Sequence, residues 1–332
     1  MLIDSYSHIM PTKYVAALRS KAPTNSFISK YIAAFPSLTD LDTRFKIMDK
    51  YDDLVQVIAL ETSEIQDPLK QEDKVELAKL ANDEMAELVF KHPDRFVAAI
   101  ASLPMSDMDA VLKEVDRTII DLKFRGVQIF TDIDGKPLDS PELMPFYEKM
   151  AYYNLPIFIH PRKERTVPDY PGESESKYLV SRIFGWPYET TVAMTRLVFS
   201  GIFEKFTNLK VMVHHCGGMV PYFAERITAH VEHSEMRMGY SYEANLTRRP
   251  IDYYRMFYSD TALFGNTPAL ACGYAFFGSD HLLFGTDMPY DSQLGDRATR
   301  QALLAIQQMD TPDAEKYKIL EDNARKLLRL PL

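Results

Sequence analysis

Residues 156–160 read PIFIH, a short apolar run that ends in a histidine. Seven other short runs have a similar character and begin near residues 2, 54, 96, 126, 210, 256 and 282. Most of these runs are almost continuously apolar and do not alternate with polar residues. Such runs are typical of parallel strands that helices cover on one face and a packed barrel interior covers on the other.

The eight runs predict strands at residues 2–6, 54–60, 96–101, 126–130, 156–160, 210–215, 256–260 and 282–287. Helical patterns lie between them, at residues 73–91, 107–123, 141–153, 189–206 and 311–330. Eight strands that alternate with helices predict the α/β class and a (β/α)8 TIM barrel. The competing fold is a doubly wound sheet, which would carry a glycine-rich phosphate-binding turn after an early strand, and the sequence offers none.

Length and composition favour one large enzyme-sized domain. The 332 residues, of which 46% are hydrophobic, can form a single barrel over residues 1–332, because no linker or low-complexity segment divides them. A formal charge of −9 argues against nucleic acid or an anionic membrane as the main partner.

The cellular compartment is predicted from apolar runs and cysteines. No apolar run approaches the 18 residues of a membrane span, and the first twenty residues lack the features of a signal peptide. Two cysteines, Cys216 and Cys272, do not make a disulfide framework. We therefore expect a cytoplasmic protein.

Three long segments follow the first, fifth and sixth predicted strands, at residues 9–40, 161–187 and 232–255. All three leave the C-terminal ends of strands, where barrel enzymes have their active sites. Loops of this length usually have a function, although any one of them could instead serve an oligomer interface.

Four predicted strands end in side chains that can bind a metal: Tyr6 and His8, His160, His214 and His215, and Asp287. Residues two apart in a strand face the same side, so Tyr6 and His8 can both face the barrel axis. His214 and His215 face opposite sides, and only one of them is expected to reach the site. Imidazoles and a carboxylate suit Zn²⁺, Mn²⁺ or Fe²⁺.

Several stretches resemble the amidohydrolase superfamily, and within it the branch of aminocarboxymuconate-semialdehyde decarboxylase and the resorcylate- and vanillate-type decarboxylases. The matching stretches are IDSYSHIMP, IFIHP, GWPYETTVAMTRLVFSGIFEKFTNLKVMVHHCGG, VPYFAERI, LLFGTDMPY and DNARKLLRL. They extend from the first strand to the last helix, so the resemblance covers essentially the whole chain. It implies one divalent metal ion, with zinc expected ahead of manganese or iron.

The resemblance also implies roles for individual residues. His8, His160 and Asp287 match metal ligands, and His215, in the HCGG turn, matches a catalytic histidine beside the metal. His214 stands where the family usually has a small residue.

Three further residues match substrate-binding positions of the family. Arg44 matches an arginine that binds the substrate carboxylate, although a salt bridge on a helix surface is the plainer interpretation. Trp186 matches an aromatic residue of the pocket, but it could equally pack in the core. Arg226 matches an arginine that reaches a neighbouring subunit's site in some members, which implies a homodimer or a higher homo-oligomer.

Tyr6 stands where many members of the superfamily have the first histidine of His-x-His. Tyr6 could bind the metal as a phenolate, which requires a pKa lowered from about 10. It could instead hydrogen-bond to water or substrate while His8, His160 and Asp287 hold the ion, or the metal could be absent. Three protein ligands suffice for a catalytic centre, so we rank the hydrogen-bonding interpretation first.

The leading functional hypothesis is non-oxidative decarboxylation of a small aromatic or unsaturated carboxylic acid. His215 or Asp287 would transfer the proton that makes the C–CO₂ bond labile. The alternative is a metal-dependent hydrolase or hydratase of a ring-cleavage or lactone substrate, which the fold alone does not distinguish. A third hypothesis is a barrel that binds without catalysis after its metal site decayed.

Overall fold

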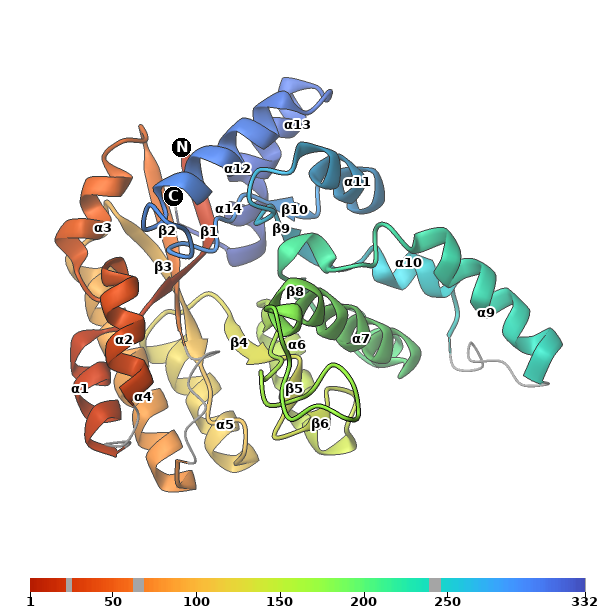
Figure 1. Cartoon of the computed structure of the whole chain (residues 1–332), viewed down its shortest axis with the longest axis horizontal. Helices are drawn as coiled ribbons and strands as arrows, with labels where there is room; N and C mark the ends of the chain where they lie inside the picture. The colour runs from red at the N-terminus through yellow and green to blue at the C-terminus, as the bar shows by residue number, and fades with distance from the viewer. Residues whose placement is uncertain (22–25, 62–68, 239–245, 332) are drawn as a thin grey trace.

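A ring of eight parallel strands forms the centre of the protein in a computed structural model that describes residues 1–21, 26–61, 69–238 and 246–331 (Figure 1). The strands are β1 (Leu2–Ile9), β2 (Leu54–Leu60), β3 (Phe96–Ser102), β4 (Val127–Phe130), β7 (Ile157–His160), β8 (Val211–Val213), β9 (Tyr258–Asp260) and β10 (Leu282–Leu283). Each pairs with the next in the order β1-β2-β3-β4-β7-β8-β9-β10. The predicted α/β barrel is therefore confirmed, and each predicted strand range overlaps one of these strands, although β1 and β3 extend beyond their predicted ends.

Backbone hydrogen bonds close the ring between its first and last strands. The N–H of Ser5 in β1 donates to the carbonyl of Phe284, just beyond β10, over 2.8 Å. The N–H of His8 donates to the carbonyl of Met288, also over 2.8 Å. These bonds continue past the short β10 and bring residues 284–288 alongside β1.

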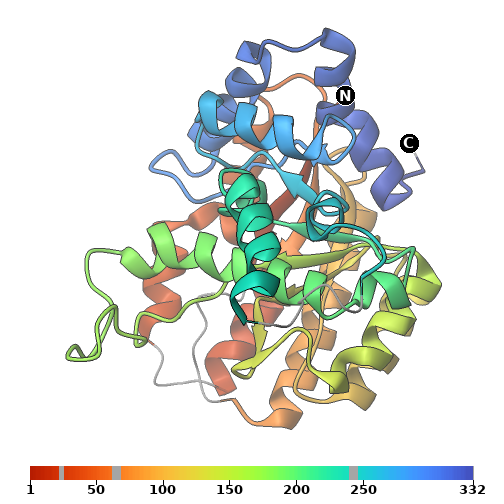
Figure 2. The ribbon, with the colours of Figure 1, turned by 90° about the vertical axis from the view of Figure 1, so that its right-hand side faces the viewer.

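Helices surround the ring in both views (Figure 1, Figure 2). They are α1 (Thr12–Lys21), α2 (Ser26–Ala34), α3 (Leu41–Met48), α4 (Gln71–Lys91), α5 (Met108–Asp116), α6 (Met144–Tyr153), α7 (Trp186–Phe199), α8 (Ile202–Lys205), α9 (Ala224–Met238), α10 (Pro250–Tyr254), α11 (Thr267–Phe277), α12 (Asp296–Gln308), α13 (Asp313–Tyr317) and α14 (Asn323–Leu328). Within the described ranges, no helix is long and apolar enough to cross a bilayer.

The predicted helices agree with this list except where a local feature divides them. The range 189–206 contains α7 and α8, because Gly201 takes a left-handed conformation with φ of 73° and interrupts the helix. The range 107–123 contains α5 and a following π-helical turn, and 311–330 contains α13, a π-helical turn and α14. A small hairpin, β5 (Asp132–Ile133) and β6 (Lys136–Pro137), was not predicted.

Strand β2 shows why the predicted strands are apolar on both faces. Val55, Val57 and Ala59 belong to the inner cluster of the barrel. Ile58 and Leu60 belong to the larger cluster that the outer helices share. Both faces are therefore dry, and helix α14 contributes to the same inner cluster.

The long segments after the strands differ from one another. The segment after β1 is largely helical, because it contains α1 and α2. Residues 161–179, after β7, form no helix or strand. The segment after β8 contains α9, which projects from the barrel in Figure 1, and its residues 239–245 lie outside the described part of the chain.

Arg44 of α3 is fully buried in the outer wall of the barrel, with 0% exposure. Its guanidinium donates to the backbone carbonyl of His8 over 2.7 Å, and to the side-chain oxygens of Gln56 and Ser7 over 2.8 Å each. Burial raises the pKa of Asp4 to about 6, and the nearby Arg44 opposes that increase. Arg44 thus joins α3 to β1 and β2.

We expect the substitution Arg44→Met to lower the free energy of unfolding by about 3–5 kcal/mol, because it leaves buried acceptors without their charged donor. Urea unfolding followed by circular dichroism measures the change. Arg297→Met is the control, since Arg297 is exposed and makes one side-chain hydrogen bond, to Gln301. Equal stability of the two variants would contradict a structural role for Arg44.

Candidate metal centre and active site

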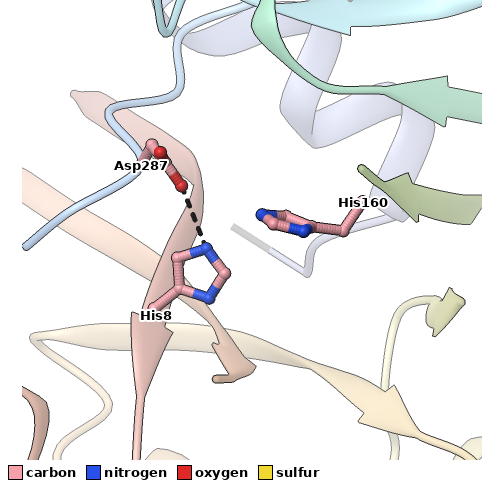
Figure 3. Close-up of side chains that lie close together, drawn as sticks. All are labelled: His8, His160 and Asp287. Atoms are coloured by element: carbon pink, nitrogen blue, oxygen red, sulfur yellow. Dashed lines mark hydrogen bonds and ion pairs between the residues drawn. The ribbon is translucent and has the colours of Figure 1, made fainter. Parts of the chain in front are cut away.

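Three side chains predicted as metal ligands converge at the C-terminal end of the barrel (Figure 3). His8 is the penultimate residue of β1, His160 ends β7, and Asp287 follows β10. Each offers one ligand atom, and these atoms lie within 4.8 Å of one another. All three residues are buried, with exposures of 1%, 2% and 7%.

The two imidazoles have defined orientations. His160 Nδ1 lies 2.8 Å from the carbonyl oxygen of Pro161, which must accept its proton, so Nε2 carries the free lone pair. His8 Nε2 lies 2.9 Å from Asp287 Oδ1, and Figure 3 shows that the other ring nitrogen of His8 faces away from Asp287. That nitrogen, Nδ1, lies 3.2 Å from Glu61 Oε2, within ion-pair distance but not aligned as a hydrogen bond.

The electrostatics of the three groups favour a bound cation. Burial alone would lower the pKa of His8, but the carboxylates of Glu61 and Asp287 outweigh it and raise that pKa. Burial and the neighbouring His8 lower the pKa of His160 well below its usual value, which keeps His160 neutral. Burial opposes ionisation of Asp287, yet hydrogen bonds from His215 and His8 hold its pKa well below the ordinary range.

His215 lies beside this cluster in a strained turn. Its Nε2 is 3.4 Å from Asp287 Oδ2. His215 and Cys216 both have positive φ, of 54° and 55°, and Gly218 follows with φ of 62° and no room for a side chain. Positive φ is rare for residues other than glycine and is often found at functional sites. Asp260 holds the turn, because its Oδ1 accepts the N–H of His215 over 2.9 Å.

Tyr6 faces the barrel interior, as predicted, but its hydroxyl points to another partner. The hydroxyl donates to Gln128 Oε1 on β4. The ring packs against His214, with centroids 3.7 Å apart, and His214 Nδ1 lies 2.7 Å from Asp260 Oδ2. Burial and then the charge of Asp287 raise the pKa of Tyr6 well above 10, so it stays a neutral phenol.

The three residues predicted to bind substrate have different locations. Trp186, at the start of α7, lies close to the site: its ring is stacked on His215 with centroids 6.3 Å apart. Arg44 is directed into the barrel wall, and the prediction of a substrate contact finds no support in its contacts. Arg226 is exposed on α9 and is not part of the cluster.

Two carboxylates of the site were not predicted from the sequence. Glu61 follows β2 directly and is buried beside His8. Asp260 ends β9 and binds both His214 and the backbone of His215. Each is an acidic residue at the end of an apolar strand, which is the same signal that identified Asp287.

The donor set suits a divalent cation of the zinc or manganese type. Two imidazole nitrogens and one carboxylate oxygen provide three protein ligands, and a catalytic metal keeps further positions for water or substrate. The free lone pair of His160 Nε2 is consistent with such an ion, because a neutral, buried imidazole is a good ligand.

Two relatives that are named as decarboxylases are similar over most of the chain. Gamma-resorcylate decarboxylase from Rhizobium sp. (strain MTP-10005) is 30% identical over 298 residues, which are 87% of this chain and 87% of the relative. The 2-amino-3-carboxymuconate-6-semialdehyde decarboxylase of Dictyostelium discoideum is 29% identical over 296 residues, 88% of this chain and 77% of the relative.

A solved structure and a family model agree with these relatives. The dihydroxybenzoic acid decarboxylase from Polaromonas sp. JS666, solved with bound manganese and the inhibitor 2-nitroresorcinol, superposes with a TM-score of 0.81 at 26% identity, covering 99% of this chain and 96% of that one. The model of the amidohydrolase family matches residues 4–330. This chain therefore belongs to the amidohydrolase family.

Proposed function

We propose that the chain is a metal-dependent carboxy-lyase that removes CO₂, without oxidation, from a small aromatic carboxylic acid. The observation that carries the proposal is the convergence of His8, His160 and Asp287 beside His215 in a chain whose relatives bear the names of decarboxylases. The fold alone would not distinguish this reaction from hydrolysis.

We propose that His8, His160 and Asp287 hold one divalent ion. When bound, the ion supplies positive charge that can bind the carboxylate and an adjacent oxygen of the substrate. Zinc was expected first from the sequence, but the Polaromonas relative contains manganese. Manganese is therefore the first ion to test, and zinc the second.

His215 is the proposed proton donor. Protonation of the ring carbon that bears the carboxylate makes the C–CO₂ bond labile, so a donor must stand close to the bound substrate. Burial would lower the pKa of His215, but its contact with Asp287 raises it, which favours a protonated imidazole near neutral pH. Asp287 is the alternative proton-transfer group, although its lowered pKa makes it a poor acid.

Trp186 and a cleft that reaches Gln128, the hydrogen-bond partner of Tyr6, are proposed to bind the substrate. The cleft has a volume of 210 Å³, and its lining includes Gln128, Phe130 and Arg162. The ring of Phe130 contacts His160, with centroids 5.9 Å apart. The half-buried Arg162 is better placed than Arg44 to meet a carboxylate, because Arg44 is fully buried and bound to protein acceptors.

We further propose that the chain acts in the cytoplasm as a homodimer. Apolar side chains are exposed on α9 and the preceding turn, among them Tyr222 at 80% and Met236 at 85% exposure. Such exposed apolar side chains support contact with a second copy of the chain. Arg226 is exposed on the same helix, and we propose that it reaches an active site in a neighbouring subunit. The unpaired Cys216 and Cys272 are consistent with a reducing compartment.

Release of CO₂ tests the reaction directly. We expect the purified, Mn²⁺-loaded chain to release CO₂ from at least one dihydroxybenzoate or muconate-type acid, and chelation to abolish the activity until Mn²⁺ is restored. Gas detection and chromatography of the products provide the measurement. A ring-opened or hydrated product without CO₂ would support the hydrolase or hydratase alternative instead.

We expect His215→Asn to lower kcat by about 10²–10⁴-fold, because it removes the proton donor. Its metal content should stay at the wild-type level, since the ligands are His8, His160 and Asp287. Steady-state kinetics and elemental analysis measure the two quantities. His281→Asn is the control, because His281 precedes β10 and so lies at the end of the barrel opposite the site. Full activity of His215→Asn would exclude this role.

We expect Tyr6→Phe to keep the wild-type metal content, because the Tyr6 hydroxyl binds Gln128. The variant should lose about 1–3 kcal/mol of stability, since Gln128 Oε1 is left without a donor. Tyr147→Phe is a matched control, because the buried Tyr147 hydroxyl donates to the carbonyl of Leu138 away from the site. Loss of metal from Tyr6→Phe alone would identify Tyr6 as a ligand.

A further inference from the structure

Glu61 is a buried carboxylate at the metal centre whose role the proposed reaction leaves open. It follows β2, and its N–H donates to the carbonyl of Ile9 over 3.0 Å, which fixes its backbone beside the end of β1. Its side chain has 0% exposure. A carboxylate that is removed from water requires charged or hydrogen-bonding partners, so the partners of Glu61 indicate its role.

Two side chains of the site meet the same oxygen of Glu61. The Tyr290 hydroxyl donates to Oε2 over 2.5 Å, and His8 Nδ1 lies 3.2 Å from that oxygen. The Tyr290 ring also packs against the His8 ring, with centroids 5.2 Å apart. Tyr290 thus holds Glu61 next to the ring nitrogen of His8 that does not face Asp287.

The position of Glu61 favours one ring nitrogen of His8 as the metal ligand. A neutral imidazole carries one proton, and a carboxylate beside Nδ1 can accept it there but cannot donate one. In the structure Nε2 is hydrogen-bonded to Asp287, so a cation bound between the two would replace the Nε2 proton. The one proton left on His8 would then be on Nδ1, which faces Glu61. Histidines that bind metals commonly donate their second N–H to a carboxylate in this way.

Glu61 also contributes to the charge balance of the site. The Tyr6 hydroxyl donates its proton to Gln128 Oε1, so it brings no negative charge to the cation. With neutral imidazoles, Asp287 alone would leave one positive charge of a divalent ion uncompensated among the three ligands. The Glu61 carboxylate, beside the ring nitrogen of His8 that does not face Asp287, compensates this charge without occupying a coordination position.

We propose that Glu61 is a positioning residue for the metal: it accepts the Nδ1 proton of His8, presents Nε2 to the cation and neutralises its remaining charge. This inference rests on the metal centre of the proposed function but not on the reaction assigned to it.

Titration of the chelator-stripped full chain with Mn²⁺ in a calorimeter tests the proposal. We expect Glu61→Gln to bind Mn²⁺ about 10–100-fold more weakly than wild type. The amide keeps the size of the side chain but can donate to Nδ1 and so favour the wrong tautomer. Glu114→Gln is the matched control, because Glu114 is equally buried but binds Arg117 and Asn82 away from the site. Wild-type affinity in folded Glu61→Gln would overturn the proposal.

A second measurement uses the wild-type chain and does not depend on whether the variant folds. Nitrogen-15 NMR of the Zn²⁺-loaded protein should show a protonated Nδ1 and a coordinated Nε2 in His8. A coordinated Nδ1, or a proton on Nε2, would overturn the proposal. Both experiments are independent of CO₂ release, so a chain that binds metal as described but releases no CO₂ would contradict the decarboxylase function alone.

Discussion

His8 Nε2 lies 2.9 Å from Asp287 Oδ1, although 279 residues separate the two in the chain. They meet only because the last strand returns to the first, where the N–H groups of Ser5 and His8 donate to carbonyls beyond β10. His160 then joins them from the other side of the ring. The site is therefore a property of the closed barrel, and any change that opened this seam would move His8 and Asp287 apart even with both side chains in place.

Buried polar side chains hold the same seam together. Asp4 on β1 accepts the backbone N–H of Thr286 over 3.0 Å and its hydroxyl over 2.7 Å, and it accepts Gln56 from β2 over 3.1 Å. Arg44 completes the network from α3. Such a network is stabilising only when every member is satisfied, which specifies one arrangement of the strands. Family resemblance assigned Arg44 to the substrate, whereas its contacts in this chain serve the closure of the barrel.

The eight strands and the three converging side chains could be predicted because their signals are local. An apolar run identifies a strand, and a polar residue at its C-terminal end is a candidate for the site. The contact between Tyr6 and Gln128 could not be predicted, since it depends on the relative positions of β1 and β4 across the barrel interior. The same holds for Glu61 and Asp260, whose partners are set by neighbouring strand ends and by the strained turn at His215. Helix boundaries were missed where one residue, such as Gly201, changes the backbone direction.

Tyr6 shows how a site can change one position and stay suited to a cation. The phenol is longer than an imidazole, so its hydroxyl reaches Gln128, while its ring covers His214 with centroids 3.7 Å apart. Burial keeps that hydroxyl protonated, and the position therefore contributes volume but no charge. Negative charge comes instead from Glu61 at the end of the adjacent strand β2, whose carboxylate lies beside His8 Nδ1. The negative charge that a divalent ion requires can thus come from a neighbouring strand. The ends of adjacent strands in a barrel lie side by side, so a carboxylate on one can serve a ligand on the next.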